Sequence, residues 1–197
     1  MRIGTKSVLF GVHQFAVHPW FVAWAWWKLY GFPWDPRLWV AFFLHDIGYL
    51  GKPNMDGPEG ETHPECAARL MSRLFGQTWG DFTLLHSRFY AKKLGRTFSR
   101  LCVADKLAIA LTPAWLYLRQ ASATGELAEY MRGTAARTPA GQRTPAQWFG
   151  DVQRYCEAWA WEHRDGRDDL WTGTKRDLAH SGTDNAAGQT PAARKDG

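Results

Sequence analysis

An adjacent histidine and aspartate, His45 and Asp46, follow an apolar run in the stretch FFLHDIGYL at residues 42–50. A neutral imidazole nitrogen and an anionic carboxylate oxygen can bind one divalent cation together, and the second carboxylate oxygen can bridge to another ion. His-Asp pairs also occur by chance, and many apolar helices end in polar residues. What the pair means therefore depends on the other histidines and aspartates of the chain.

Apolar residues recur at helical spacing along most of the chain, and no alternating apolar and polar pattern predicts a strand. We therefore expect an all-α fold. The first helices are expected at 7–30, with a kink at Pro19, and at 36–46. The others are expected to begin at Thr62 and to cover 79–94, 96–119, 125–133 and a segment that starts at Pro145. Thr62 and Glu65 match a capping box, which would place His63 in the first turn.

The chain is long enough for one domain with a sizeable core, since 45% of its 197 residues are hydrophobic. We expect this domain to cover 1–172, with the motifs at about 12–114 and further helices at 125–172. The small, polar composition of 173–197 predicts a disordered tail. On the last helix, an amphipathic stripe that includes Trp148 and Trp159 indicates core or the surface of a homodimer.

Six of the twelve tryptophans lie between Trp20 and Trp39, but the apolar run from Phe15 to Trp27 is too short to cross a bilayer, which requires roughly 20 residues. We therefore expect a buried helix and no membrane span. No cleavage signal follows the N-terminal apolar patch, and the three cysteines form no CxxC motif. These features predict a cytoplasmic protein without a disulfide framework.

The segment from His86 to Lys106 is strongly basic, with six Lys and Arg residues against the single acid Asp105. Such a segment favours an anionic partner, although a solvated helix face is the alternative. We therefore expect an anionic partner, and we expect no stable complex with nucleic acid.

Six residues of metal-binding type recur along the expected helices: His18, His45, Asp46, His63, His86 and Asp105. They lie, in order, in the stretches HPWFVA, AFFLHDIGY, THPECAARL, LLHSR and LCVADKLAIA, and in these stretches the chain resembles the HD-domain superfamily of metal-dependent phosphohydrolases. The resemblance covers residues 12–114, just over half of the chain.

The resemblance implies an HD-domain helical bundle that binds two divalent metal ions, with Fe, Mn, Co, Ni and Mg all acceptable. It implies that His18, His45, Asp46 and Asp105 hold one ion, and that Asp46 bridges to a second ion held by His63 and His86. His13 is an alternative first ligand or a residue behind the ligands, whereas His163 and His180 are expected at the surface.

The expected activity is hydrolysis of a phosphoester or phosphoanhydride of a small phosphorylated or nucleotide-like substrate, by a water that the metals activate. Besides Asp46, the candidate catalytic residues are Lys52 on the loop after the His-Asp pair and the phosphate-binding Arg88 and Lys106. The general acid stays open among four loop residues: Lys52, Asp56, Glu59 and Glu61.

Three alternatives follow from the same residues. Members of the HD-GYP type have paired histidines at the fourth position and a GYP signature, and the stretch LLHSRFYAKKLG has neither, so this subfamily is disfavoured. A mixed-valent diiron oxygenase that acts on a small polar or phosphonate substrate would use the same six ligands. A regulatory module that uses its metal only for folding would not need all six ligands.

Overall fold

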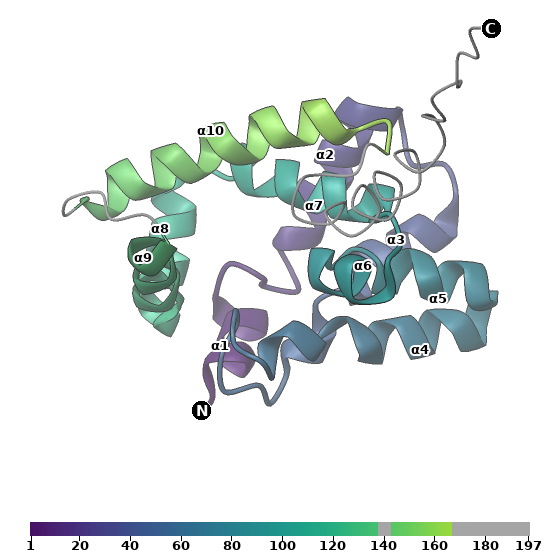
Figure 1. Ribbon diagram of the computed structural model, residues 1–197, viewed down its shortest axis with the longest axis horizontal. Coiled ribbons are helices and arrows are strands. Elements are labelled where there is room, and N and C mark those ends of the chain that lie inside the picture. Colours follow the sequence, from purple (N-terminus) through teal and green to yellow (C-terminus); the bar gives the residue numbers. More distant parts are fainter. Residues whose placement is uncertain (138–142, 167–197) are drawn as a thin grey trace, which may run out of the picture.

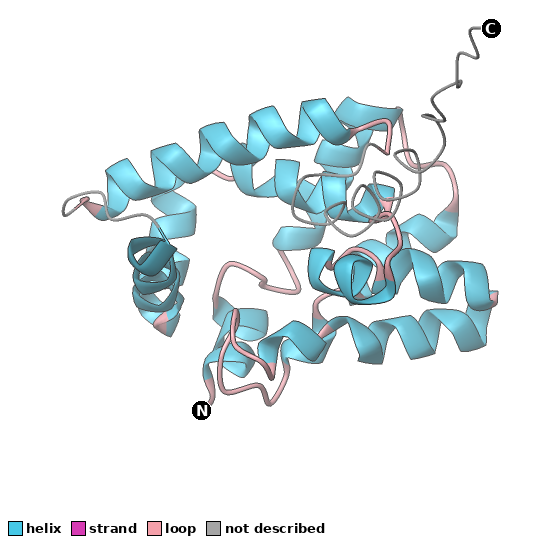
Figure 2. Cartoon of the chain, in the orientation of Figure 1, coloured by secondary structure: helices cyan, strands magenta, loops and turns pink. Residues whose placement is uncertain are grey.

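The computed structural model describes residues 1–137 and 143–166, and these form an all-α protein (Figure 1). Figure 2 shows that the described elements are helices joined by loops, without a strand. The α-helices are α1 (Ile3–Phe10), α2 (His18–Tyr30), α3 (Pro36–Leu44), α4 (Pro64–Phe75), α5 (Gln77–Leu84), α6 (Arg88–Leu94), α7 (Arg100–Leu111), α8 (Ala114–Thr124), α9 (Glu126–Arg137) and α10 (Pro145–His163). Two 3-10 turns, η1 (Ile47–Tyr49) and η2 (Gly60–Thr62), interrupt the long connection between α3 and α4.

The main core lies where α7 packs between α2 and α10. Its fully buried side chains include Val22, Phe42, Leu101, Leu107 and Ala160. Helices α4 and α5 pack against each other, while α8 packs on α1 and α9. In Figure 1, α8 and α9 lie to the left of the molecule and α4, α5 and α6 to the right. The all-α prediction is therefore confirmed.

Two helix starts follow the capping rules. The Asp35 side chain accepts a hydrogen bond from the Arg37 backbone N–H (2.9 Å), and Pro36 occupies the first turn of α3, where its missing N–H costs nothing. Thr144 and Gln147 form a capping box at the start of α10. By contrast, the expected capping box at Thr62 is absent, because the Thr62 hydroxyl donates to the Glu59 carbonyl (2.8 Å) and α4 begins at Pro64.

The expected helix over 7–30 is wrong, since the chain forms α1 and α2 with an irregular segment at 11–17 between them. This segment wraps around the buried carboxylate of Glu126, which accepts a hydrogen bond from the Val12 N–H (3.3 Å). Gly11 is required there, because a Cβ at this position would lie 2.2 Å from Glu126 Oε2. Pro19 stands in the first turn of α2 and does not kink a longer helix.

Two more expected helices are divided. The segment 79–94 breaks at His86, where the Ser87 hydroxyl accepts from the Tyr90 N–H and caps α6. The segment 96–119 breaks before Pro113, because proline cannot supply the backbone hydrogen bond that would continue α7. The axes of α7 and α8 consequently differ by 102°.

No single helix among the described residues is long and apolar enough to cross a membrane. Helices α7 and α8 reach that length and composition only as a bent pair, and six of the twelve residues of α7 are buried in the fold. The expectation that the N-terminal tryptophans are buried is wrong for part of α2, where Trp20, Trp24 and Trp27 are exposed.

His163 is buried, contrary to expectation, and its ring stacks on that of Phe98 with 6.0 Å between the centroids. The stripe on α10 is partly core, since Trp148 and Trp159 are buried, while Tyr155 is exposed. The predicted tail at 173–197, and His180 with it, lie outside the described residues.

Phe42 has no exposed surface and contacts the rings of Trp26 and Trp39, so Phe42→Ala would leave a cavity in the main core. We expect this substitution to lower the free energy of unfolding by about 3–5 kcal/mol in chemical denaturation. The matched control is Trp34→Ala, which removes an aromatic side chain that is 84% exposed and should change stability by less than about 0.5 kcal/mol. Equal losses for the two variants would contradict this description of the core.

Candidate metal centre

The six residues of metal-binding type converge on one buried point, although they are spread over 88 positions of the chain. Their ligand atoms form two groups, in each of which all the atoms lie within 4.8 Å of one another. Asp46 belongs to both groups. The first group is His18, His45, Asp46 and Asp105, and the second is Asp46, His63 and His86.

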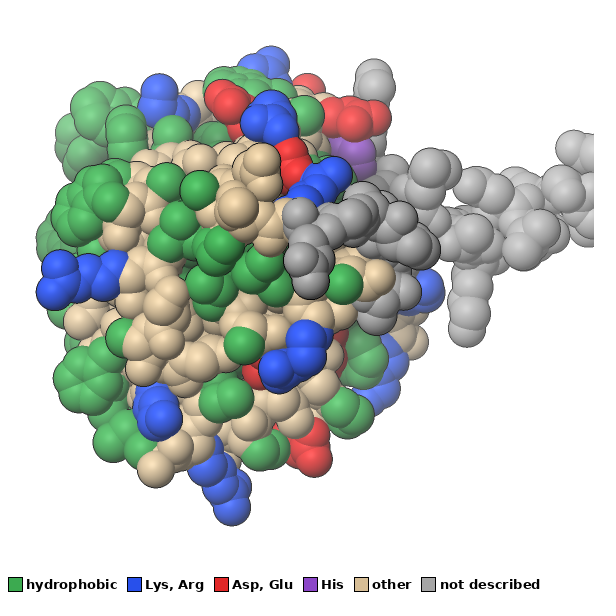
Figure 3. Space-filling view, turned by 90° about the vertical axis from the view of Figure 1, so that its left-hand side faces the viewer, with side chains coloured by type: hydrophobic (Ala, Val, Ile, Leu, Met, Phe, Trp, Pro, Cys, Tyr) green, Lys and Arg blue, Asp and Glu red, His purple; other side chains and the backbone are tan. Residues whose placement is uncertain are grey.

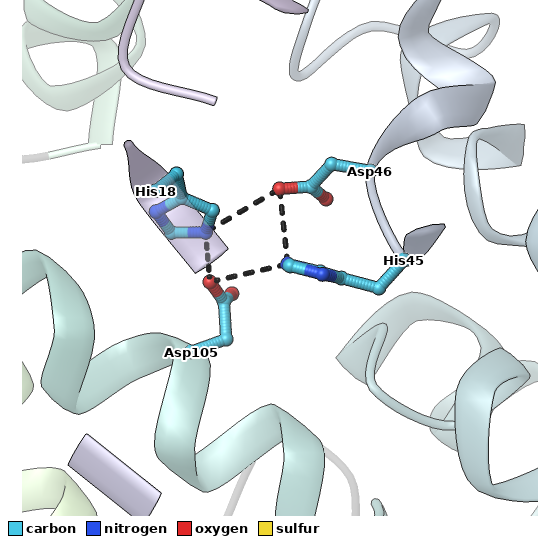
Figure 4. Close-up of side chains that lie close together, drawn as sticks. All are labelled: His18, His45, Asp46 and Asp105. Atoms are coloured by element: carbon cyan, nitrogen blue, oxygen red, sulfur yellow. Dashed lines mark hydrogen bonds and ion pairs between the residues drawn. The ribbon is translucent and has the colours of Figure 1, made fainter. Parts of the chain in front are cut away.

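The first group joins the start of α2, the end of α3 and the middle of α7 (Figure 4). His18 Nε2 lies 3.0 Å from Asp105 Oδ1 and 3.5 Å from Asp46 Oδ2. His45 Nε2 lies 3.0 Å from Asp46 Oδ2 and 3.8 Å from Asp105 Oδ1. Two imidazole nitrogens and two carboxylate oxygens therefore face one another, as the ligands of a single divalent cation would.

The second group uses the other oxygen of the same carboxylate. Asp46 Oδ1 lies 3.6 Å from His63 Nε2 and 3.7 Å from His86 Nε2. Because Asp46 Oδ2 faces the first group, this one side chain separates the two sets of ligands and contributes to both. That is the arrangement in which a carboxylate can bridge two ions.

Three histidines are oriented by the backbone so that Nε2 faces the centre. Nδ1 of His45, His63 and His86 lies 2.9, 2.8 and 2.6 Å, respectively, from a backbone carbonyl oxygen three residues earlier in the chain. A carbonyl can only accept, so each Nδ1 carries the hydrogen and each Nε2 faces the centre, where it offers a lone pair when the ring is neutral. Burial lowers the pKa of the His45 ring, but Asp46 and Asp105 outweigh burial and hold this pKa well above its usual value, so the ring carries a proton that a metal ion would displace. The three carbonyls lie at a helix end or in turns, where a C=O group has a lone pair to spare for a side chain.

The two Nε2 atoms of His63 and His86 lie only 3.0 Å apart. Burial, followed by the neighbouring His86, lowers the pKa of His63 to about 3, so this ring is neutral at physiological pH. With both Nδ1 atoms protonated, two lone pairs face each other at hydrogen-bond distance without a hydrogen between them. A cation bound by both nitrogens would relieve this repulsion.

The first group contains two buried polar atoms that also lack a well-formed hydrogen bond. His45 Nε2 and Asp46 Oδ2 lie 3.0 Å apart, and neither makes a hydrogen bond of good geometry to a residue of 1–137 and 143–166. Burial of polar atoms without a partner costs free energy, and a metal ion would supply the missing interaction. The residues present therefore fit a divalent metal.

Both carboxylates are held in the ionised form. Burial raises the pKa of Asp46, but His45 and His13 outweigh this effect and hold the pKa well below its usual range. Burial likewise raises the pKa of Asp105, and hydrogen bonds with His18 and His45 reverse the shift. The centre thus holds two ionised carboxylates, whose charge the His45 ring compensates in part and a metal cation would compensate further.

The basic candidates lie in two places. Lys106, next to Asp105, is half-buried and makes no hydrogen bond or ion pair in the described part of the chain. Arg88 stacks over the Trp159 ring at 5.3 Å, and both cations influence the pKa of Cys156, which places them around the same thiol. The Lys52 ammonium instead donates to the Thr62 hydroxyl, beside His63.

Among the acidic loop residues proposed as general acid, Glu61 differs from Glu59. Burial, with a further contribution from Asp56, raises the pKa of Glu61, whereas a hydrogen bond from Asn54 lowers the pKa of Glu59. The positive charge of Lys106 acts in the opposite direction and lowers the pKa of Glu61 in part. A carboxyl group with a raised pKa is better suited to hold a proton for a leaving group.

A network around Glu126 was not anticipated from the sequence. Glu126 Oε1 accepts a hydrogen bond from Ser7 Oγ (2.5 Å) and lies 3.3 Å from His13 Nδ1. The His13 ring lines a small hollow beside the first group, with its centroid 5.7 Å from that of His18. His13 is therefore not one of the clustered ligands but stands behind them. No local signal identifies Glu126, which is 113 residues away from His13.

Comparisons of the chain with protein-family models, with curated proteins and with solved structures found no match. The function is therefore inferred from the chemistry of the site.

Gly48 fixes the position of His63, because a Cβ at residue 48 would lie 1.9 Å from the His63 carbonyl oxygen. Gly48→Ala should displace His63 and weaken binding of a divalent ion by about 10- to 100-fold, as measured by titration calorimetry with Mn²⁺. Gly150→Ala is the matched control, since its Cβ would meet only Arg154 Nη1, at 3.7 Å. Unchanged affinity in Gly48→Ala would show that His63 does not contribute to the binding of the ion.

Proposed function

We propose that the chain is a metal-dependent phosphohydrolase of the HD-domain type, acting on a small phosphorylated or nucleotide-like substrate. The observation that supports this most is the divided role of Asp46, whose two oxygens face two different sets of imidazole nitrogens. Such a set of donors suits a pair of divalent ions, and paired ions are a recurrent device for cleaving phosphoesters and phosphoanhydrides.

The first ion would be held by His18, His45, Asp105 and one oxygen of Asp46. The second would be held by His63, His86 and the other oxygen of Asp46. When bound, the two ions would activate a water as nucleophile and neutralise charge on the phosphoryl group. The protein's own task is to position the ligands, and the hydrogen bonds from Nδ1 of three histidines to backbone carbonyls do this.

Lys106 and Arg88 would bind the phosphoryl oxygens of the substrate. Lys106 is adjacent to Asp105 in sequence and interacts with its charge at longer range, but its ammonium makes no close ion pair within 1–137 and 143–166. A half-buried cation of this kind attracts an anion more strongly than an exposed one, because water screens it less. The planar guanidinium of Arg88 can donate two parallel hydrogen bonds to phosphate oxygens.

Two further residues would handle protons. Glu61, with its raised pKa, would donate a proton to the oxygen of the leaving group. His13, oriented by Glu126 and Ser7, would hold a hydrogen bond to a group in the hollow beside His18. Lys52 remains a further candidate. Its ammonium donates to the hydroxyl of Thr62, the residue before His63.

The experiment is a panel of nucleotides and simple phosphoesters, assayed with protein reconstituted with Mn²⁺, Co²⁺, Ni²⁺, Fe²⁺ or Mg²⁺. We expect hydrolysis that chelator abolishes, and we expect Lys106→Met to lower kcat/KM by at least about 100-fold, because it removes a charge that contacts the reacting phosphoryl group. Lys93→Met, which removes an exposed lysine from α6, is the control and should be as active as the unmodified protein. Full activity in Lys106→Met would contradict its role in phosphate binding.

A diiron oxygenase is the second candidate, and the composition of the second group of ligands favours it. Two imidazoles and a single carboxylate oxygen form a set that suits iron. Mössbauer and EPR spectroscopy of protein purified without oxygen separate the two activities. Two irons per chain, a mixed-valent signal after partial oxidation and substrate-dependent O₂ uptake would replace the hydrolase assignment.

A further inference from the structure

An unusual surface lies on the outer side of α2, where aromatic side chains are exposed to solvent instead of buried. Trp20, Trp24 and Trp27 are 57%, 44% and 58% exposed, and their spacing of four and three residues places them along one face of the helix. We call this surface, together with its ring contacts, the aromatic face. Its members are Phe15, Trp20, Trp24, Trp27, Phe32, Trp34, Trp39 and Phe43.

Most rings of the aromatic face form a continuous layer, whereas Trp24, on the same face of α2, contacts the Phe21 ring with 6.3 Å between centroids. Trp20 contacts Trp39 and Phe43, with centroids 5.8 and 5.7 Å apart. Phe32 then connects this group to the far end of the layer, since its ring lies 6.1 Å from Trp27 and 4.5 Å from Trp34, which is 84% exposed. Because an exposed apolar layer of this extent is costly in water, it indicates an interaction surface.

The chain segment that supplies most of the aromatic face is basic. No acidic residue occurs in the first 34 positions, which contain Arg2, Lys6 and Lys28. Lys28 is exposed, and its ammonium lies 5.5 Å from the centre of the Trp24 ring. The first acid, Asp35, is neutralised by an ion pair with Arg37 at 2.6 Å. The face therefore combines tryptophan, phenylalanine and lysine without an unpaired negative charge.

We propose that the aromatic face docks the protein onto a membrane surface that contains anionic lipid. Tryptophan and phenylalanine insert at the boundary between headgroups and acyl chains, and lysine binds anionic headgroups. The helix would lie in the plane of the surface, which agrees with the lack of a helix long enough to span a bilayer among the described residues. The proposal does not depend on the reaction at the metal centre.

The position of the aromatic face favours a lipid surface over a second copy of the chain. Phe15 and Phe43, whose ring centroids lie 5.6 Å apart, belong both to the face and to the lining of the hollow beside His18 and Asp46. A second copy seated there would bring Lys28 of each chain to the same interface. At a membrane surface, anionic headgroups supply the charge that is opposite to that of Lys28.

The side of the protein that carries α8 and α9 differs from the aromatic face in its mixture of side chains. Figure 3 shows the side on which α8 and α9 lie in Figure 1, and there hydrophobic side chains stand among basic and acidic ones. Trp115, on α8, is 71% exposed but lies on a helix that packs on α1, α9 and α10. It offers a matched tryptophan outside the aromatic face.

The test is sedimentation of the full chain with vesicles made of phosphatidylcholine alone or of equal parts phosphatidylcholine and phosphatidylglycerol. We expect binding to the mixed vesicles, weakened by salt, and a loss of at least roughly tenfold in the partition coefficient for the double variant Trp24→Ser and Trp27→Ser. The control Trp115→Ser should bind as the unmodified chain does, and circular dichroism of each variant verifies folding.

Three results would overturn the proposal. The unmodified chain could stay in the supernatant with both kinds of vesicle, or it could bind the two kinds equally. The third is a dimer in sedimentation equilibrium that the double variant converts to a monomer, which would identify the aromatic face as a contact between copies of the chain.

Discussion

The Asp46 carboxylate is the group on which the described structure depends most. It is buried, it is ionised, and its two oxygens face two separate sets of imidazole nitrogens. Burying such a charge requires compensation, which the surrounding histidines supply in part and which bound cations would complete. A chain without these histidines would have no reason to keep an aspartate at the centre of its fold.

Most of the ligands lie where regular structure stops. His18 is the first residue of α2, His45 and Asp46 follow α3, His63 precedes α4, and His86 lies between α5 and α6. Carbonyl groups at a helix end or in turns can accept from side chains, and three of them fix the ring of a histidine. Asp105 alone projects from the middle of a helix, α7, which is held between α2 and α10.

Local signals in the sequence were sufficient to predict helices, the start of α3 at Pro36, the start of α10 at Pro145 and the set of candidate ligands. They could not predict the break at 11–17, because it depends on a distant contact, whereas the break at His86 has a local signal in Ser87, which caps α6. Gly11 meets Glu126 from α9, and Glu65, expected to cap α4, accepts a hydrogen bond from Tyr90 instead.

The surface was harder to predict than the site. Tryptophans at helical spacing indicate a buried stripe as readily as an exposed one, and only packing decides between them. In α2, Val22, Ala25 and Trp26 are buried against the core, which leaves the other side of the helix, with Trp20 and Trp27, facing outward. Likewise, Glu126 has no local feature that reveals its contact with His13 and Ser7.

The most direct measurement is elemental analysis of the chain purified without chelator and of two variants that divide the ligands. The account predicts two divalent ions per chain in the unmodified protein, one in the double variant His63→Ala and His86→Ala, and none in Asp46→Ala. Near-normal metal content in Asp46→Ala, or loss of both ions in the double histidine variant, would contradict two separable sites joined by one carboxylate.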